Sequence, residues 1–120
     1  SLNLAFLGDA VYSLMVRQYL VNSGDFPVGE LTERSIGYVS AFAQAKAVRK
    51  LLDQDILNEQ EKAVYMRGRN AHTNSPARHT DIQTYHAATG FEALIGYLYL
   101  KKDEERLRQI WDFLAKNRED

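Results

Sequence analysis

The chain has 120 residues, of which 45% are apolar and 26% charged, and its formal net charge is −1 at pH 7. This length is typical of one domain, so we expect residues 1–120 to form a single domain around one core. No window approaches the run of about 20 apolar residues that a membrane helix needs, and the absence of cysteine excludes disulfides and thiolate metal sites. We therefore expect a cytoplasmic protein without a membrane span, in which any contact with nucleic acid comes from local clusters of Lys and Arg.

The first expected helix begins near Leu4 and ends near Asn22, where the sequence NSGDFP brings turn residues together. Its apolar residues lie at helical spacing on two faces: Leu4, Leu7, Val11, Leu14 and Met15 on one, and Phe6, Tyr12, Val16 and Tyr19 on the other. A helix that is apolar around so much of its circumference is expected at the centre of the fold. One acid, Asp9, interrupts this apolar stretch beside Gly8.

Three shorter helices are predicted in the middle of the chain. The first follows Pro27 and ends near Tyr38, and Ser40 is expected to cap the second. The apolar stripe expected on that second helix consists of Ala41, Ala45, Val48 and Leu52. Asn58 and Glu61 have the spacing of a capping box, which opens a helix that runs into the sequence MRGRNA.

Residues 72–80, with the sequence HTNSPARHT, have no apolar periodicity and are predicted to form a polar loop. Thr80 with Gln83 is typical of a helix cap, and the helix that follows contains the second strongly apolar stretch, GFEALIGYLYL. Asp103 is expected to cap the last helix. The core positions of that helix are Leu107, Ile110, Trp111 and Leu114. No stretch alternates with the period of a strand, so the sequence predicts an all-α fold of about six helices in one bundle.

Each of the two strongly apolar helices contains a single acid, Asp9 in the first and Glu92 in the second. Gly8, Gly90 and Gly96 allow the helix backbones to approach closely and leave a recess beside the carboxylates. Two carboxylates in a recess provide the oxygen ligands that Mg²⁺ prefers. Each acid can equally be satisfied by a neighbouring backbone group or an arginine, and residue spacing alone does not decide between these interpretations.

A basic cluster surrounds the end of the fourth predicted helix, and its members are Lys62, Arg67, Arg69, Arg78 and His79. Cations at a helix C-terminus often complement the helix dipole, so the cluster alone is a weak indication of nucleic-acid binding. Its position directly before the second apolar helix makes these residues candidates for contacts to phosphates, which weaken as salt rises. Arg67 or Arg69 could instead hold the following loop in place.

The two acidic segments resemble the ribonuclease III family. LAFLGDAVYSLMVR is similar to that family's signature helix, whose common form reads ERLEFLGDAVL, and ATGFEALIGYLYL is similar to its second catalytic helix, ADTFEALIGAIYL. GELTERSIGYVS matches the intervening region more loosely. Within the family, the short chain and the stretch MRGRNA followed by TDIQTY resemble the Mini-III group.

The resemblance implies a ribonuclease III-type endonuclease fold and a homodimeric, Mg²⁺-dependent endoribonuclease. Such an enzyme hydrolyses double-stranded RNA and leaves 5′-phosphate and 3′-hydroxyl ends, and Mn²⁺ is expected to substitute for Mg²⁺. For the Mini-III group, the resemblance also implies maturation of bacterial large-subunit (23S) ribosomal RNA. A ribosomal protein is then a candidate partner that presents the precursor.

The resemblance also assigns individual residues. Asp9 matches the aspartate of FLGDA and Glu92 the glutamate of FEAL, so both are expected to be catalytic metal ligands. Two further carboxylates of the family pattern are absent, because Ala5 and Thr89 stand at their positions, replacements that look typical of Mini-III. Thr89 is a candidate for a contact to the metal through a bound water. Fewer charged ligands should weaken metal binding.

Two other functions compete with this expectation. A ribonuclease III-like domain that has lost half of its carboxylates could bind structured ribosomal RNA without cutting it, although the presence of both acids in apolar helices favours the enzyme. An all-α nucleotide pyrophosphohydrolase also places acids around magnesium, but it usually needs clustered ExxE-type acids. Each apolar helix here has one acid only. Apolar side chains at Phe6, Tyr12 or Tyr38 could serve either a dimer interface or the core.

Overall fold

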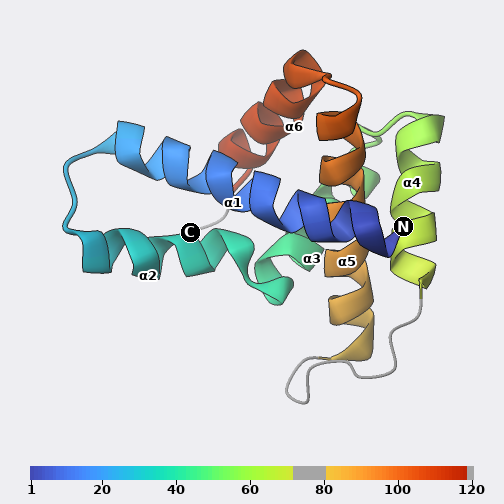
Figure 1. Ribbon diagram of the computed structural model, residues 1–120, viewed down its shortest axis with the longest axis horizontal. Helices are drawn as coiled ribbons and strands as arrows, with labels where there is room; N and C mark the ends of the chain where they lie inside the picture. Colours follow the sequence, from blue (N-terminus) through green and yellow to red (C-terminus); the bar gives the residue numbers. More distant parts are fainter. Residues whose placement is uncertain (72–80, 119–120) are drawn as a thin grey trace.

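The computed structural model describes residues 1–71 and 81–118, and these residues form six helices (Figure 1). In chain order they are α1 (Leu2–Ser23), α2 (Val28–Val39), α3 (Ala41–Asp53), α4 (Glu59–Asn70), α5 (Ile82–Leu100) and α6 (Glu104–Lys116). The described residues contain no strand, so the all-α prediction is confirmed. None of these helices combines the length and the apolar content needed to cross a membrane. The loop predicted at residues 72–80 lies outside the described residues.

Side-chain caps confirm three of the predicted helix starts. At the start of α3, Ser40 Oγ accepts a hydrogen bond from the backbone N–H of Ala43 at 3.2 Å. At the start of α4, Asn58 and Glu61 form the capping box in both directions, at 2.8 and 2.9 Å. Asp103 caps α6 in the same way. Such caps depend on residues that are neighbours in the chain, which explains why the sequence alone indicates them.

The cap of α5 differs from the prediction. The N-cap residue is Asp81 rather than Thr80, and Asp81 Oδ2 accepts a hydrogen bond from the backbone N–H of Thr84 at 3.3 Å. A carboxylate caps a helix at least as well as a hydroxyl and also complements the positive end of the helix dipole. The helix therefore begins at Ile82.

The central helix of the fold is α5. Helices α1, α3, α4 and α6 all pack against it, α1 most extensively, whereas α2 packs against α1 and α3. Figure 1 shows that α1 crosses α5 and that α4 runs beside α5. The large side chains of α5 that are fully buried are Phe91, Leu94, Ile95 and Leu98. Burial of these side chains is the main stabilising contribution to the fold.

Glycines allow the backbones of α1 and α5 to touch where the helices cross. A Cβ atom on Gly8 would lie 1.7 Å from the backbone carbonyl oxygen of Glu92. A Cβ atom on Gly96 would lie 2.1 Å from the carbonyl oxygen of Leu4, and Gly90 allows a similar approach to α4. The close approach of helix backbones that was predicted at these three glycines is confirmed. The close approach of α1 and α5 brings together the two apolar segments that each contain one acid.

One face of α1 remains at the surface, although the sequence predicted this helix at the centre of the fold. Tyr12 and Val16 are buried, but Phe6 is 84% exposed and Leu14 is 62% exposed. The central position belongs to α5, and α1 covers it from one side. Asp9 lies between these two exposed side chains in the sequence and is itself exposed.

The buried stripe of α3 is rotated from the predicted one. It consists of Gln44, Val48 and Leu51. Of the stripe that was predicted, Val48 is buried, whereas the other three residues are only half-buried. The predicted stripe contained apolar residues only, whereas the face that packs against α5 and α6 includes the amide of Gln44.

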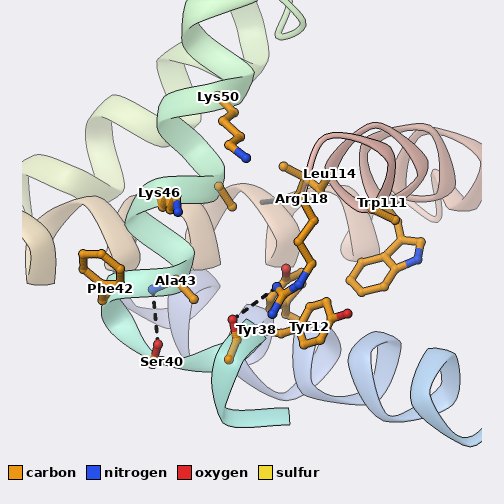
Figure 2. Close-up of a pocket in the computed structure, with 13 residues that line it drawn as sticks. Tyr12, Tyr38, Ser40, Phe42, Ala43, Lys46, Lys50, Trp111, Leu114 and Arg118 are labelled. Carbon is orange, nitrogen blue, oxygen red and sulfur yellow. Dashed lines mark hydrogen bonds between the residues drawn. The ribbon is translucent and has the colours of Figure 1, made fainter. Parts of the chain in front are cut away.

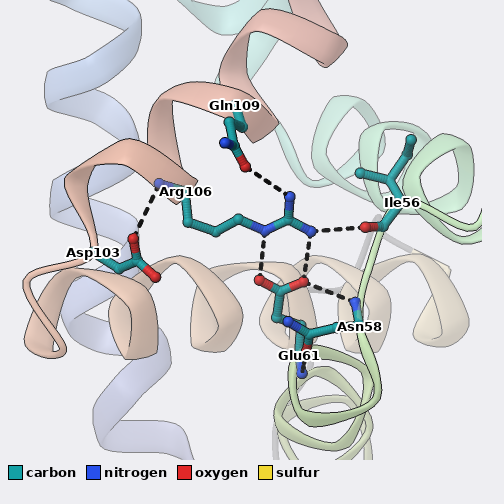
Figure 3. A network of polar contacts seen from close by, with 6 residues as sticks. All are labelled: Ile56, Asn58, Glu61, Asp103, Arg106 and Gln109. Carbon is teal, nitrogen blue, oxygen red and sulfur yellow. Dashed lines mark hydrogen bonds and ion pairs between the residues drawn. The ribbon is translucent and has the colours of Figure 1, made fainter.

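A buried ion pair joins the start of α4 to the start of α6 (Figure 3). Arg106 Nε and Nη2 donate hydrogen bonds to the two carboxylate oxygens of Glu61 at 2.7 and 2.8 Å. The same Nη2 donates to the carbonyl oxygen of Ile56 at 2.7 Å. Although Glu61 is only 3% exposed, its charge is compensated by this two-pronged contact. The pair therefore fixes the two helix starts relative to each other.

Candidate functional site

The two lone acids of the sequence, Asp9 and Glu92, meet at the crossing of α1 and α5, and we refer to them as the acid pair. Gly8 sets the α1 backbone against the carbonyl group of Glu92, so the residue after it is held beside the same turn of α5. The two carboxyl groups lie close enough for the charge of Asp9 to raise the pKa of Glu92. Asp9 is exposed and Glu92 is half-buried, so the acid pair is open to solvent on the α1 side.

The electrostatic environment of the acid pair disfavours ionisation of the Glu92 carboxyl group. Burial raises the pKa of Glu92, the negative charge of Asp9 raises it further, and the pKa reaches about 7 although the Gln44 side chain acts in the opposite direction. No ion pair joins either acid to another residue within 1–71 or 81–118. Two acids that repel each other without a compensating cation are typical of a functional site.

The donor set of the acid pair fits a divalent cation. Carboxylate oxygens are hard ligands, and a bound cation would remove the repulsion that raises the pKa of Glu92. The described part of the chain contains no group of three or more His, Asp or Glu side chains arranged to hold a metal. An ion held by two carboxylates alone would keep several water ligands.

Thr89, the third residue that the sequence connected with a metal, lies one turn before Glu92 on α5 and is 8% exposed. Its hydroxyl group donates a hydrogen bond to the carbonyl oxygen of Tyr85 at 3.0 Å. The proton of Thr89 is thus used within its own helix, while the oxygen can still accept a hydrogen bond. The water-mediated contact stays a prediction.

Gln44 is a neighbour of the acid pair that sequence reasoning missed. From α3, its Nε2 donates a hydrogen bond to the carbonyl oxygen of Val39 at 3.1 Å. The Gln44 side chain also opposes the increase in the pKa of Glu92. Its Oε1 is a buried atom without a hydrogen-bond partner among the described residues. A signal in the sequence could have found it: Gln44 precedes Val48 by four residues and Leu51 by seven, the spacing of residues on one buried helix face.

The basic residues singled out in the sequence are not all brought together. Arg67 and Arg69 lie in the last turn of α4, where Arg67 is exposed and Arg69 half-buried. Arg78 and His79 lie outside the described residues. The two described arginines lie at a helix end, as predicted. This position is compatible both with contacts to phosphates and with a role in holding the following loop.

Lys62 lies near the other end of α4, about 8 Å from Arg67 and about 10 Å from Arg69 along the helix axis. Its Nζ is 3.1 Å from a carboxylate oxygen of Asp55 and 3.6 Å from one of Glu59. These ion pairs raise the pKa of Lys62 and give the side chain a local partner. Lys62 is therefore separated from the other described cations of the basic cluster.

A groove between α3, α4 and α5 contains a second arginine that the sequence analysis did not single out. Arg49 of α3 and Arg69 of α4 both line it. Both guanidinium groups act on the hydroxyl group of Tyr65. Burial raises the pKa of Tyr65, and the two guanidinium groups oppose this increase. Nothing in the sequence around Arg49 distinguishes it from an ordinary exposed arginine of an amphipathic helix.

A separate hollow lies between α1, α2, α3 and α6 (Figure 2). Its lining includes Tyr38, Lys46, Lys50, Trp111 and Arg118. The Arg118 guanidinium lies 3.6 Å from the ring centre of Tyr38, and Nη1 donates to the carbonyl oxygen of Gly37 at 3.2 Å. Neither acid of the acid pair lines this hollow, so it is distinct from the candidate site.

Comparisons with known proteins identify the family of this chain. The ribonuclease III domain family matches residues 2–103, a span that includes both acids. The Mini-ribonuclease 3 of Enterococcus faecalis is 42% identical over 115 residues, which cover 96% of this chain and 87% of that protein. The Mini-ribonuclease 3 of a Thermoanaerobacter species is 47% identical over 107 residues, or 89% and 74% of the two chains. A crystal structure of a Fusobacterium nucleatum protein, 33% identical, covers 96% of this chain and 90% of its own with a TM-score of 0.84.

Proposed function

This chain belongs to the ribonuclease III family, in which it groups with the Mini-ribonuclease 3 proteins as an endoribonuclease, and we propose that the acid pair is its cleavage site. We propose that residues 1–120 act as one catalytic domain that hydrolyses phosphodiester bonds of double-stranded RNA in the presence of Mg²⁺. The products would carry 5′-phosphate and 3′-hydroxyl ends. The observation that carries the proposal is the Glu92 carboxyl group, which faces another acid instead of a cation.

In this mechanism, Asp9 and Glu92 hold the metal ion. When bound there, a divalent cation supplies Lewis acidity, which lowers the pKa of the attacking water and stabilises charge on the leaving oxygen. Glu92 is held on the central helix and Asp9 on the helix that touches it, so the separation of the two carboxylates is set by rigid elements. Asp9 faces solvent, where a phosphodiester can approach.

The substrate is proposed to be contacted by the cations near the end of α4. Duplex RNA is recognised mainly through its phosphates and 2′-hydroxyl groups, and Arg67, Arg69 and Arg49 offer guanidinium groups for such contacts. Replacing Arg67 and Arg69 with alanine should weaken duplex binding and reduce its salt slope by about one per lost contact. An unchanged salt slope would favour the alternative in which these arginines only hold the following loop.

We also propose that the enzyme is a homodimer, as its resemblance to the family implies. Phe6 and Leu14 leave apolar surface exposed on both sides of Asp9 in α1. Tyr12, which the sequence offered as an alternative interface residue, is 3% exposed and belongs to the core. Replacing Phe6 with serine should shift the sedimentation coefficient from that of a dimer to that of a monomer. A parent protein that is monomeric at micromolar concentration would contradict the proposal.

The proposed cellular role is maturation of large-subunit ribosomal RNA in the cytoplasm, with a ribosomal protein as the candidate partner that presents the precursor. This role rests on the resemblance of the chain to the Mini-III group. Cells that depend on an inactive Glu92→Gln variant should accumulate uncut large-subunit precursor, which primer extension across the precursor ends would detect. Normal ends would exclude the role without affecting the assignment of the cleavage site.

Cleavage of a long double-stranded RNA in Mg²⁺, followed on a denaturing gel, tests the proposed function. We expect the parent to cut, and Glu92→Gln to lose more than about 100-fold in rate while it still binds the duplex. Glu105→Gln removes one exposed carboxylate from α6 and should cut like the parent. Full activity in Glu92→Gln would exclude the acid pair as the site, and binding without cleavage by the parent would favour the docking module.

A further inference from the structure

The hollow between α1, α2, α3 and α6 gathers positive charge at a distance from the acid pair. Three of its lining residues are cations, Lys46, Lys50 and Arg118, and no Asp or Glu is among the described residues that line it. The chain as a whole has a formal net charge of −1, so this excess of positive charge is a local property of the hollow. A concave surface lined by one sign of charge attracts ligands of the opposite sign.

The Arg118 side chain is oriented by contacts with neutral groups. Its guanidinium lies 3.6 Å from the ring centre of Tyr38, and its Nη1 donates a hydrogen bond to the carbonyl oxygen of Gly37 at 3.2 Å. Tyr38 in turn stacks on Trp111, with ring centres 5.9 Å apart and an angle of 28° between the ring planes. These contacts orient the guanidinium without cancelling its charge, because a carbonyl group and an aromatic ring carry no net charge.

The two lysines lie one helical turn apart on α3. Figure 2 shows both on the α3 side of the hollow and Arg118 on the side of α6. Lys50 Nζ donates a hydrogen bond to the carbonyl oxygen of Asn117, the residue before Arg118. Like charges one turn apart on a helix repel each other, and a bound anion relieves that repulsion. The start of α3, with Ser40 as its N-cap, adds the positive end of a helix dipole to the same hollow.

The size of the hollow limits the kind of anion that fits. Its volume is about 310 Å³, which is at the lower end of the range of small-ligand pockets. Three cations around so small a volume match an anion whose negative charges lie close together. Phosphate groups in series meet this requirement better than the carboxylates of a peptide, which lie on separate residues. Lysine and arginine are also the usual protein ligands of phosphate.

We propose that this hollow is a second binding site, for an anion with two or more phosphate groups in series. A nucleoside diphosphate and the backbone of single-stranded RNA both carry such groups. Phe42 lines the same hollow and is 71% exposed, so its ring can stack on a nucleobase of either ligand. The proposal does not depend on cleavage at the acid pair, because neither Asp9 nor Glu92 lines the hollow.

The fluorescence of Trp111 provides the first test, because Trp111 lines the hollow and is the single tryptophan of the chain. Pyrophosphate would be titrated into the parent in EDTA, so that no divalent cation contributes to binding. We expect a saturable change in fluorescence with a Kd below about 1 mM, and an affinity that falls as the salt concentration rises. The absence of a saturable change would overturn the proposal.

Lys46→Met and Lys50→Met each remove one cation and keep most of the side-chain length. We expect each to weaken pyrophosphate binding by about 10-fold or more, the effect of losing one hydrogen bond between charged groups. Lys116→Met removes the same charge from an exposed position of α6 that does not line the hollow, and it should bind pyrophosphate like the parent. Equal weakening in all three variants would show a general effect of net charge and would overturn the proposal.

Thermal unfolding of the same variants separates binding from a structural role of the lysines. A purely structural role predicts a lower melting temperature with unchanged pyrophosphate binding, and this result would overturn the proposal. Lys46 is exposed, so we expect Lys46→Met to keep the melting temperature of the parent while it loses affinity for pyrophosphate. The test therefore holds even if Lys50→Met, which loses the contact with Asn117, is less stable.

Competition with pyrophosphate distinguishes the sources of the phosphate groups. Displacement by adenosine diphosphate but not by a single-stranded oligouridylate would support the site and assign it to a free nucleotide. Displacement by the oligouridylate that is weakened in Lys46→Met would support the site and assign it to an RNA strand. A tetraglutamate peptide should compete poorly. If this peptide binds more tightly than pyrophosphate, the hollow is a site for an acidic protein segment and the proposal is overturned.

Discussion

Two glutamates that pack within the same bundle have opposite environments. Glu61 is 3% exposed and faces Arg106, whose guanidinium binds both carboxylate oxygens. Burial alone would raise the pKa of Glu61, but the hydrogen bonds from Arg106 and from the backbone of Asn58 outweigh it, and the pKa is lowered. Glu92 is less buried, yet its pKa is raised to about 7 by burial and by Asp9.

The difference shows that burial does not by itself distinguish a structural acid from a functional one. Glu61 is the more deeply buried of the two, but a partner cation makes it part of the scaffold. Glu92 has no ion pair among the described residues, and the charge that acts on it, that of Asp9, has the same sign. The charge of its partner therefore indicates whether an acid is structural or functional. The substitutions below test this criterion, from the largest expected effect to the smallest.

Arg106→Met would leave Glu61 buried without its cation. We expect the free energy of unfolding to fall by about 3–5 kcal/mol, because an uncompensated buried charge is strongly unfavourable. Urea unfolding would measure this loss, and cleavage per folded molecule should not change. Arg34→Met is the control, since Arg34 pairs with Glu30 on the surface and should contribute about 1 kcal/mol or less. Equal losses in the two variants would contradict the distinction.

Gly8→Ala would force α1 and α5 apart at the acid pair. The new Cβ atom would lie 1.7 Å from a backbone oxygen, and a helix backbone cannot yield as a side chain does. We expect a loss of at least about 3 kcal/mol in the free energy of unfolding, toward the upper end of overpacking effects. Gly29→Ala should instead be neutral or stabilising by up to about 1 kcal/mol, because nothing lies within 4 Å of its Cβ position. A stable Gly8→Ala variant would mean that the two backbones do not touch.

Asp9→Asn removes one of the two like charges while it keeps the shape of the side chain. We expect the cleavage rate to fall more than about 100-fold, equivalent to about 2.7 kcal/mol of transition-state stabilisation. The melting temperature should remain the same or rise, since the repulsion with Glu92 is removed. Gel assays at saturating Mg²⁺ and thermal unfolding measure the two effects. A variant that cuts normally at saturating Mg²⁺ would contradict the role of Asp9.

The stability of the metal-free protein should depend on pH with opposite signs at the two glutamates. The pKa of Glu92 is raised above 4.5, so its contribution to stability is complete below pH 4.5 and is lost as the pH rises through about 7. The lowered pKa of Glu61 means that its contribution is lost as the pH falls below 4.5. Urea unfolding in EDTA between pH 5 and pH 8 should show a decline on the order of 1 kcal/mol in the parent.

The same decline should be absent in Glu92→Gln, which cannot ionise at that position. Mg²⁺ should reduce the decline in the parent, because the ion binds the folded, ionised acid pair and not the unfolded chain. A decline that is equal in the parent and in Glu92→Gln would assign the effect to another titrating group.

The elements that sequence reasoning predicted correctly are those that depend on near neighbours. The caps at Ser40, Asn58 and Asp103 involve residues three positions apart, and the six helices follow from apolar periodicity. The two acids were also singled out, since a single acid inside an apolar helix is conspicuous in the sequence. The interpretation of that pair as two metal ligands remains a proposal.

Apart from the cap of α5, which is Asp81 and not Thr80, the predictions that failed concern the choice of a helix face. Phe6 is as apolar as Tyr12, but Phe6 is exposed and Tyr12 is buried because α5 covers only one side of α1. Gln44 is polar and was excluded from the predicted stripe, but packing between α3 and α5 buries it beside Glu92. Hydrophobicity indicates how much of a helix can be buried, whereas the neighbouring helices decide which side is buried.

The sequence by itself determined the helices, three of their caps, and the glycines and lone acids of the two apolar segments, because these features depend on the order of residues along one helix. The tertiary structure alone decided which charges meet. Arg106 reaches Glu61 across 45 positions of the chain, and Asp9 meets Glu92 only where α1 crosses α5. Electrostatic energies depend on distance in space and on burial, and chain order specifies neither.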